Sequence, residues 1–293
     1  MKTPLLYALG LTALAVGPLW AQDRKASERE PQDAAYSYVL ADVSYVSDAV
    51  FMGRRDTVAA PYLLPSLGYY HKSGFFADAS LSYLVAEGEG RVDLFLLTAG
   101  FTFGKDRLSG GISGTAYSFN EASYNVKSET VGDLTGLVGY DWGPLETSLS
   151  LSAYFNNGDS ADFFSGIMLS RDLVSSDKHW LFRPSFSAFA GTQNFYEAYY
   201  NTSRLGNRKG SGRGPGGGGT SSKNVTLAEV AQFKLLNLEF SLPVYYFKGH
   251  FILSVNPSLA LPQSPATVTG TDLDYTEELD PSFYVIAGLS YWF

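Results

Sequence analysis

The sequence predicts an all-β protein, a closed antiparallel transmembrane β-barrel of about twelve strands with short turns at one end and longer loops at the other. Three observations carry this prediction. Apolar residues alternate with small or polar ones, short and long connections alternate along the chain, and aromatic residues gather beside the short connections. The 293 residues include 15% aromatic residues and no cysteine, which excludes a disordered chain, a disulfide scaffold and a thiolate metal site.

Residues 1–21 have the pattern of a secretory signal peptide. Lys2 precedes an apolar run from Leu5 to Trp20, and Ala21 supplies a small residue at the expected cleavage site. A membrane anchor is the alternative, but the run is short and no basic stop-transfer flank follows it. Residues 22–34 are polar and of mixed charge, so they predict a flexible tail ahead of a transmembrane β-barrel at 35–293.

Alternation is clearest between Leu145 and Phe155. The odd positions of this segment are mostly apolar, whereas the even positions carry Glu146, three serines and Tyr154. A period of two residues indicates a strand. In such segments the polar face is rich in Ser, Gly and Thr, where a soluble sheet usually presents long charged side chains to water. We therefore expect these small polar residues to line a confined lumen.

Twelve strands are expected, at 36–46, 61–71, 75–86, 91–103, 107–119, 129–142, 145–156, 161–173, 180–191, 225–247, 249–260 and 282–293. Tight turns are expected at 72–74, 104–106, 143–144, 174–179 and 248, and more open loops at 47–60, 87–90, 120–128, 157–160, 192–224 and 261–281. The two kinds of connection alternate, so every tight turn falls at the end where both termini lie. The first and last strands must pair, because an open sheet edge in lipid leaves backbone groups without hydrogen bonds.

The last strand carries a more specific motif. Alternate residues share one face and end the chain on an aromatic residue: Phe283, Val285, Ala287, Leu289, Tyr291 and Phe293. This segment resembles the C-terminal signal of bacterial outer-membrane β-barrel proteins, which in that family is read by the barrel-assembly machinery. The resemblance implies an outer-membrane location, periplasmic turns and tail, extracellular loops, and contact with outer-membrane lipid and lipopolysaccharide.

Strand parity predicts six charged residues in the lumen: Asp42, Asp78, Asp141, Glu146, Arg183 and Glu239. As a pore lining, one cation among carboxylates would mildly favour cations or polar neutral solutes. The alternative is a structural network in which Arg183 is bridged to carboxylates, since a low-dielectric lumen favours paired charges.

Two long loops carry opposite charges. The segment 204–223 is glycine-rich and basic, which predicts a flexible extracellular loop or a contact with lipopolysaccharide phosphates; its cations are Arg204, Arg208, Lys209, Arg213 and Lys223. The last loop is acidic, with Asp272, Asp274, Glu277, Glu278 and Asp280. We hypothesise that the two loops associate by charge over the mouth of the barrel. The acidic loop matches a calcium-binding loop poorly, and no metal or cofactor is expected.

The sequence favours a narrow channel for small polar solutes. The alternative is a non-transporting structural barrel of the cell envelope, or one that binds a ligand or an envelope protein partner. An enzyme is not expected, because His71, His179 and His250 each lie beside a tight turn and far from one another in sequence. A net charge of −8 argues against a nucleic acid partner.

Overall fold

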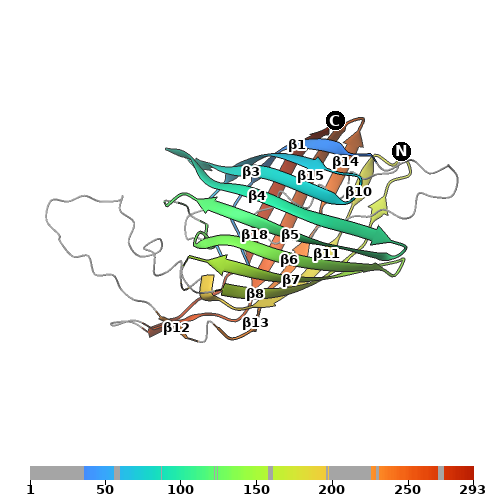
Figure 1. Cartoon of the computed structure of the whole chain (residues 1–293). Coiled ribbons are helices and arrows are strands. Elements are labelled where there is room, and N and C mark those ends of the chain that lie inside the picture. The colour runs from blue at the N-terminus through green and yellow to red at the C-terminus, as the bar shows by residue number, and fades with distance from the viewer. Residues whose placement is uncertain are drawn as a thin grey trace.

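The computed structural model describes residues 36–55, 60–86, 88–121, 123, 125–157, 161–195, 197, 226–228, 231–269 and 274–293. It confirms the predicted fold class: a closed antiparallel barrel whose wall has twelve strands (Figure 1). The predicted signal peptide (1–21) and tail (22–34) lie outside the described residues. Among the described residues, no helix is long and apolar enough to span a membrane.

The strands follow one another around the wall in chain order, and β1 pairs with β18 to close it. The wall consists of β1 (Tyr38–Val46), β2 (Tyr62–Tyr70), β3 (Phe75–Ala86), β4 (Glu89–Lys105), β5 (Leu108–Phe119), β6 (Thr130–Asp141), β7 (Glu146–Asn156), β8 (Ala161–Ser170), β9 (Leu173–Val174), β10 (Trp180–Phe182), β11 (Ser185–Gly191), β13 (Lys234–Ser241), β14 (Val244–Lys248), β15 (Phe251–Pro262) and β18 (Ser282–Trp292). Closure gives hydrogen-bond partners to the backbone N–H and C=O groups of β1 and β18, which would otherwise face lipid unpaired.

Three wall strands are each divided into two pieces: β8 and β9, β10 and β11, and β13 and β14. The pairing register is the same on both sides of each interruption. Pro184 and Pro243 lie at two of the interruptions, and a proline has no N–H to donate to a neighbouring strand. The interruptions therefore mark missing ladder bonds within continuous strands, and the barrel keeps its twelve-strand wall.

Most connections alternate as predicted between tight turns and more open loops, but the open loop predicted at 87–90 is wrong. β3 ends at Ala86 and β4 begins at Glu89, so this connection is shorter than the 175–179 turn between β9 and β10. Each tight turn contains one residue with positive φ: Gly74, Asp106, Gly143, Lys178 and Gly249. Short hairpin turns favour positive φ because their backbone twist then matches that of the flanking strands. At Gly74 a Cβ atom would lie 2.0 Å from the carbonyl oxygen of Thr102, so only glycine fits there.

The outer face of the wall is apolar, as a membrane-spanning barrel requires. Leu67, Leu97 and Leu151 keep more than half of their surface exposed, whereas their polar neighbours point inward. Aromatic rings lie exposed near the tight turns, where they suit the membrane–water boundary; examples are Phe75, Trp142 and Trp180. Parity turns the neighbouring Tyr70 and Phe76 inward, where they stack with each other.

A second sheet lies outside the wall and was not predicted. It comprises β12 (Thr226–Ala228), β16 (Thr267–Thr269) and β17 (Asp274–Thr276), in the order β12–β16–β17. The predicted strand at 225–247 is therefore wrong in its first part, since the wall strand begins at Lys234. The last loop, predicted without strands, contributes β16 and β17 to this sheet at the loop end of the barrel (Figure 1).

Candidate functional site

The lumen is lined by small polar side chains that keep part of their surface exposed. Ser66, Ser80, Thr135, Ser150 and Ser254 belong to five different wall strands, and all five are half-buried. Each alternates with outward residues of the apolar face. An inward side chain in the middle of a strand can be exposed only to the space inside the barrel. The central lumen is therefore not filled by side chains, and its surface is one that water can wet.

Asp42 and Asp78 lie on the inward face of β1 and β3 and are both buried. The Asp42 carboxylate accepts hydrogen bonds from Ser44 at 2.8 Å and from Ser290 at 2.6 Å. Asp78 lies beside Gly68 of β2, which has no side chain to separate it from β1. Two of the predicted lumen carboxylates thus lie on the same part of the wall, on strands that β2 separates.

Arg183 and Glu146 lie together on another part of the wall. The buried Arg183 side chain donates from Nε and Nη2 to the two carboxylate oxygens of Asp172. Glu146 on β7 also interacts with Arg183 electrostatically. The geometry is a fork of two parallel bonds to one carboxylate, the strongest form of side-chain ion pair. This arrangement matches the structural network that the sequence left as an alternative for Arg183.

The other two predicted lumen residues hold local structure. Asp141 accepts a 2.6 Å hydrogen bond from the backbone N–H of Gly143 and so caps the turn between β6 and β7. Glu239 on β13 is half-buried and accepts bonds from Asn237 and Ser241 at 3.3 and 3.4 Å. The six predicted residues are therefore distributed over several parts of the lumen and do not form one cluster.

Residues 47–55, here called the plug, fold into the loop end of the barrel. Ala49 packs against the β2–β3 wall, Val50 packs against Ala260 and Tyr284 of β15 and β18, and Phe51 packs against the β7–β8 wall. Phe51 is 2% exposed, and its ring lies 5.8 Å from Tyr154, 5.7 Å from Phe164 and 5.0 Å from Phe195. Three consecutive plug residues contact three different parts of the wall, so the plug crosses the lumen.

The tip of the plug is a tight turn. Phe51 and Arg54 exchange backbone hydrogen bonds at 2.8 and 2.9 Å, with Met52 and Gly53 between them at φ 49° and 76°. A left-handed conformation is unfavourable for a side chain as bulky as methionine. At Gly53 a Cβ atom would lie 2.8 Å from Asn237 Oδ1 and from Pro262 Cβ. The turn therefore packs directly against β13 and β15, and the contact is so close that only glycine fits at position 53.

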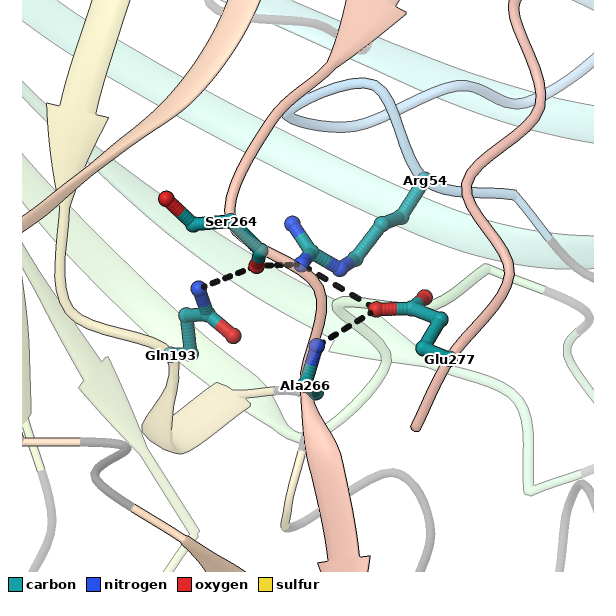
Figure 2. A network of polar contacts seen from close by, with 5 residues as sticks. All are labelled: Arg54, Gln193, Ser264, Ala266 and Glu277. Carbon is teal, nitrogen blue, oxygen red and sulfur yellow. Dashed lines mark hydrogen bonds and ion pairs between the residues drawn. The ribbon is translucent and has the colours of Figure 1, made fainter. Parts of the chain in front are cut away.

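Arg54 fastens the plug to the last loop (Figure 2). Its side chain is buried, and Nη2 donates to the carbonyl oxygen of Ser264 at 3.0 Å and to Glu277 Oε2 at 3.2 Å. The same Glu277 oxygen accepts the backbone N–H of Ala266 at 3.1 Å. Gln193, which follows β11, donates to the Ser264 carbonyl at 3.4 Å. We call this network the latch, because it joins three loops that are distant in sequence.

Lys127 lies beneath the plug among aromatic rings. Its ammonium group is 4.2 Å from the ring centre of Tyr117 and 5.1 Å from those of Phe51 and Tyr154. It donates to the Tyr117 hydroxyl at 3.1 Å, and that hydroxyl donates to Asp133 at 2.6 Å. Burial lowers the pKa of Lys127 to about 8, an effect that the negative charge of Asp133 partly opposes.

The Lys127 pKa predicts a pH-dependent stability. Between pH 8 and 10 the unfolded chain keeps the lysine proton that the folded barrel has released, so folding stability rises with pH in this range. From pH 7.5 to 9.5 we expect a gain of roughly 2 kcal/mol in the free energy of unfolding relative to a Lys127→Met variant. Urea unfolding in detergent at several pH values measures it. Parallel pH profiles for the two proteins would contradict the prediction.

The three histidines lie beside tight turns, each exposed or half-buried. His71 Nδ1 is 2.8 Å from Ser73 Oγ, and His179 Nδ1 is 3.4 Å from Asp177 Oδ2. A serine-type catalytic triad needs serine, histidine and an orienting carboxylate in one chain of contacts. Among the described residues, His71 contacts Ser73, but no carboxylate forms an ion pair with His71. That the protein is not an enzyme stays a prediction.

Only part of the predicted lid lies among the residues that the structure describes. Arg204, Arg208, Lys209, Arg213 and Lys223 lie outside the described residues, and so does Asp272. Of the acidic loop residues, Glu277 bonds with Arg54 of the plug. The charge partner found for the last loop thus comes from 47–60, a loop to which the sequence analysis gave no role. The lid between 192–224 and 261–281 remains a hypothesis.

Sequence reasoning missed the plug, the latch and Lys127. One signal was present: Val50, Phe51 and Met52 form an apolar triplet inside a connection that was expected to face water. An apolar triplet in an external loop favours insertion into the barrel over exposure. Asp172 could have been found by extending the inward parity of β8 by one step beyond Ser170. For Lys127 the sequence offers no signal, because its aromatic neighbours come from three other segments.

The outward face of β18 is the one that carries the predicted assembly signal. Phe283, Leu289 and Phe293 are exposed on it, whereas the intervening Tyr284 and Ser290 are buried. Recognition of this face by the barrel-assembly machinery stays a prediction.

No family model matches the chain, and no curated protein matches it. Among solved structures, the chain is similar to the KdgM porin, at 8% identity and a TM-score of 0.45, over 86% of this chain and 98% of that one. It is also similar to LpxR from Salmonella typhimurium, at 10% identity and a TM-score of 0.44, over 87% and 100% of the two chains. OmpT, an outer membrane protein of Vibrio cholerae, is similar at 8% identity and a TM-score of 0.35, over 88% and 98%.

Proposed function

We propose that this barrel is a narrow channel for small polar solutes in the bacterial outer membrane, held closed at its loop end by the plug. The observation that carries the proposal is the set of half-buried serine and threonine side chains that point into the central lumen from five strands. A barrel that served only as a structural element would gain stability from larger side chains at these positions, because filled interiors maximise contact.

The charges of the lumen favour cations over anions. Asp42, Asp78, Glu146 and Glu239 all point inward, while Arg183 is bonded to Asp172. An excess of carboxylates on a low-dielectric wall attracts cations and repels anions. We therefore expect small cations and neutral polar solutes to pass more readily than anions of the same size.

A second function is favoured by the plug itself. Its side chains fill the loop end of the barrel with buried apolar contacts, as in a protein that presents a fixed surface. On this alternative the barrel binds a ligand or an envelope partner through its loops and conducts nothing.

Reconstitution into planar bilayers across a potassium chloride gradient separates the two functions. A channel gives stepwise currents with a reversal potential that indicates a preference for potassium. Heat-modifiable migration on a detergent gel first verifies that the sample is a folded barrel. A folded protein that produces no current steps, with the plug intact and with the Phe51 and Arg54 side chains both truncated, would rule out the channel.

A further inference from the structure

The outer face of the wall changes from apolar to aromatic along β9, β10 and β14. Leu173 of β9 pairs with Phe182 of β10, and both side chains are exposed on the outer face. Two residues nearer the tight turn, Trp180 pairs with Tyr246 of β14, and the two rings lie 4.7 Å apart. Trp180 is exposed, whereas the intervening Leu181 is buried on the inward face. The ring pair therefore faces outward, where aromatic side chains suit the membrane–water boundary.

Basic side chains follow directly beyond this ring pair. Lys178 and His179 come immediately before β10, Lys248 is the last residue of β14, and all three are exposed. The backbone N–H of Phe247 donates to the carbonyl oxygen of His179 at 2.8 Å, so the pairing of β10 with β14 continues into the turn. The His179 ring stacks on Tyr246, with ring centres 6.0 Å apart. The two lysines thus lie at the ends of adjacent strands, above one aromatic surface.

The described part of the chain leaves the two lysine charges without an ion pair. None of the ion pairs among the described residues involves Lys178 or Lys248. The carboxylate of the same turn, Asp177, accepts hydrogen bonds from the Ser175 hydroxyl and from the His179 backbone N–H, and its Oδ2 is 3.4 Å from His179 Nδ1. Asp177 is therefore held by its own turn, and the lysines remain open to an external anion.

We propose that the turns after β9 and β14 bind the headgroup of an anionic phospholipid, with its phosphate at Lys178 and Lys248. Lysines close to a membrane surface attract anionic lipids. The order of the outer face, apolar then aromatic then cationic, is the order of a phospholipid from its acyl chain to its phosphate. A soluble phosphate or an acidic protein would need the cations but not the apolar and aromatic surface that leads to them. This surface lies outside the barrel, so it goes beyond the proposed function and does not depend on conduction.

Quenching of tryptophan fluorescence by lipids with brominated acyl chains tests the surface. The barrel keeps Trp180 as its single tryptophan, with the other three replaced by phenylalanine, and is reconstituted in mixtures of phosphatidylglycerol and phosphatidylcholine. We expect phosphatidylglycerol to be preferred at Trp180 by about fivefold for each lysine. Lys178→Gln/Lys248→Gln should remove most of this preference. Lys72→Gln/Lys105→Gln is the matched control: it takes two exposed lysines from other tight turns and should leave the preference unchanged.

A second tryptophan gives a control within the same barrel. Trp142 is exposed and lies 4.6 Å from the Tyr140 ring, but its turn carries no lysine. With Trp142 as the single tryptophan, Lys178→Gln/Lys248→Gln should not change the relative quenching by the two lipids. Equal quenching of Trp180 by both lipids would overturn the proposal. An equal loss of preference in the two lysine double variants would also overturn it, because diffuse surface charge would then explain the binding.

Native mass spectrometry repeats the test on the chain with all its tryptophans. The native chain released from detergent should retain more phosphatidylglycerol than Lys178→Gln/Lys248→Gln, and as much as Lys72→Gln/Lys105→Gln. Retention that is the same in all three proteins would contradict the proposal. The replaced lysines are exposed, so both double variants should fold, and heat-modifiable migration on a detergent gel verifies this for each protein.

Discussion

Truncating Phe51 and Arg54 together should open the barrel, with single-channel conductance or open probability rising severalfold over the native chain. Phe51 is buried against rings from three segments, and Arg54 bonds to Ser264 and Glu277 of the last loop. Removing a buried phenylalanine side chain costs about 3–5 kcal/mol where its contacts exist. If the open state lacks these contacts, a loss of about 3 kcal/mol raises the open-to-closed ratio on the order of a hundredfold. Planar-bilayer recordings of Phe51→Ala/Arg54→Ala measure this.

Phe76→Ala is the matched control for the loss of an aromatic side chain. Phe76 is as buried as Phe51 but packs with Tyr38 and Tyr70 near the tight turns, at the other end of the lumen. It should lower stability by a similar amount and leave gating unchanged. If the native chain conducts and the Phe51 and Arg54 double variant conducts equally, the plug does not close the channel. If neither protein conducts, the binding or structural function is favoured.

Replacing Arg183 by methionine should destabilise the barrel by about 3–5 kcal/mol. The Arg183 side chain is buried and holds both oxygens of Asp172, with Glu146 close by. Its removal leaves two carboxylates facing each other on a low-dielectric wall, and removing one partner of a buried ion pair costs far more than the pair itself contributes. Urea unfolding in detergent micelles, followed by tryptophan fluorescence, gives the free energy.

Two variants show whether the cost comes from uncompensated charge. Arg183→Met combined with Asp172→Asn should recover most of the loss, because one of the stranded charges is then gone. Arg55→Met removes an arginine whose side chain is 45% exposed and pairs with Asp48, and it should cost less than about 1 kcal/mol. Equal losses in Arg183→Met and in the double variant would indicate that Arg183 acts through packing alone.

The barrel could be predicted from the sequence because its rules are local. A residue that points outward in β7 is apolar and its neighbour is a serine, and that pattern repeats wherever lipid lies on one side and the lumen on the other. The parity that identifies a strand also assigns the inward charges, so Asp42, Asp78 and Arg183 could be named in advance. Position near a tight turn is a weaker guide than parity: Tyr70 and Phe76 are neighbours of boundary aromatics, yet they point inward and stack with each other.

The plug could not be predicted in the same way, because its partners are remote in sequence. Arg54 bonds with Glu277 across 223 positions, and Ala49, Val50 and Phe51 each contact a different part of the wall. No periodicity relates these residues. Similarly, the separate sheet of β12, β16 and β17 pairs short segments from two different loops.

The alternation of the chain by itself determined that this protein forms a closed barrel with an apolar outside and a polar inside, since hydrocarbon and water each select one face of every strand. Which loop enters the barrel, and which charges meet there, was decided only by tertiary structure. Curvature brings β1 and β18 together and places the 47–55 segment opposite β7 and β8. Contacts across the lumen depend on how many strands separate two segments around the closed barrel. That arrangement is set by the whole chain and not by any local pattern.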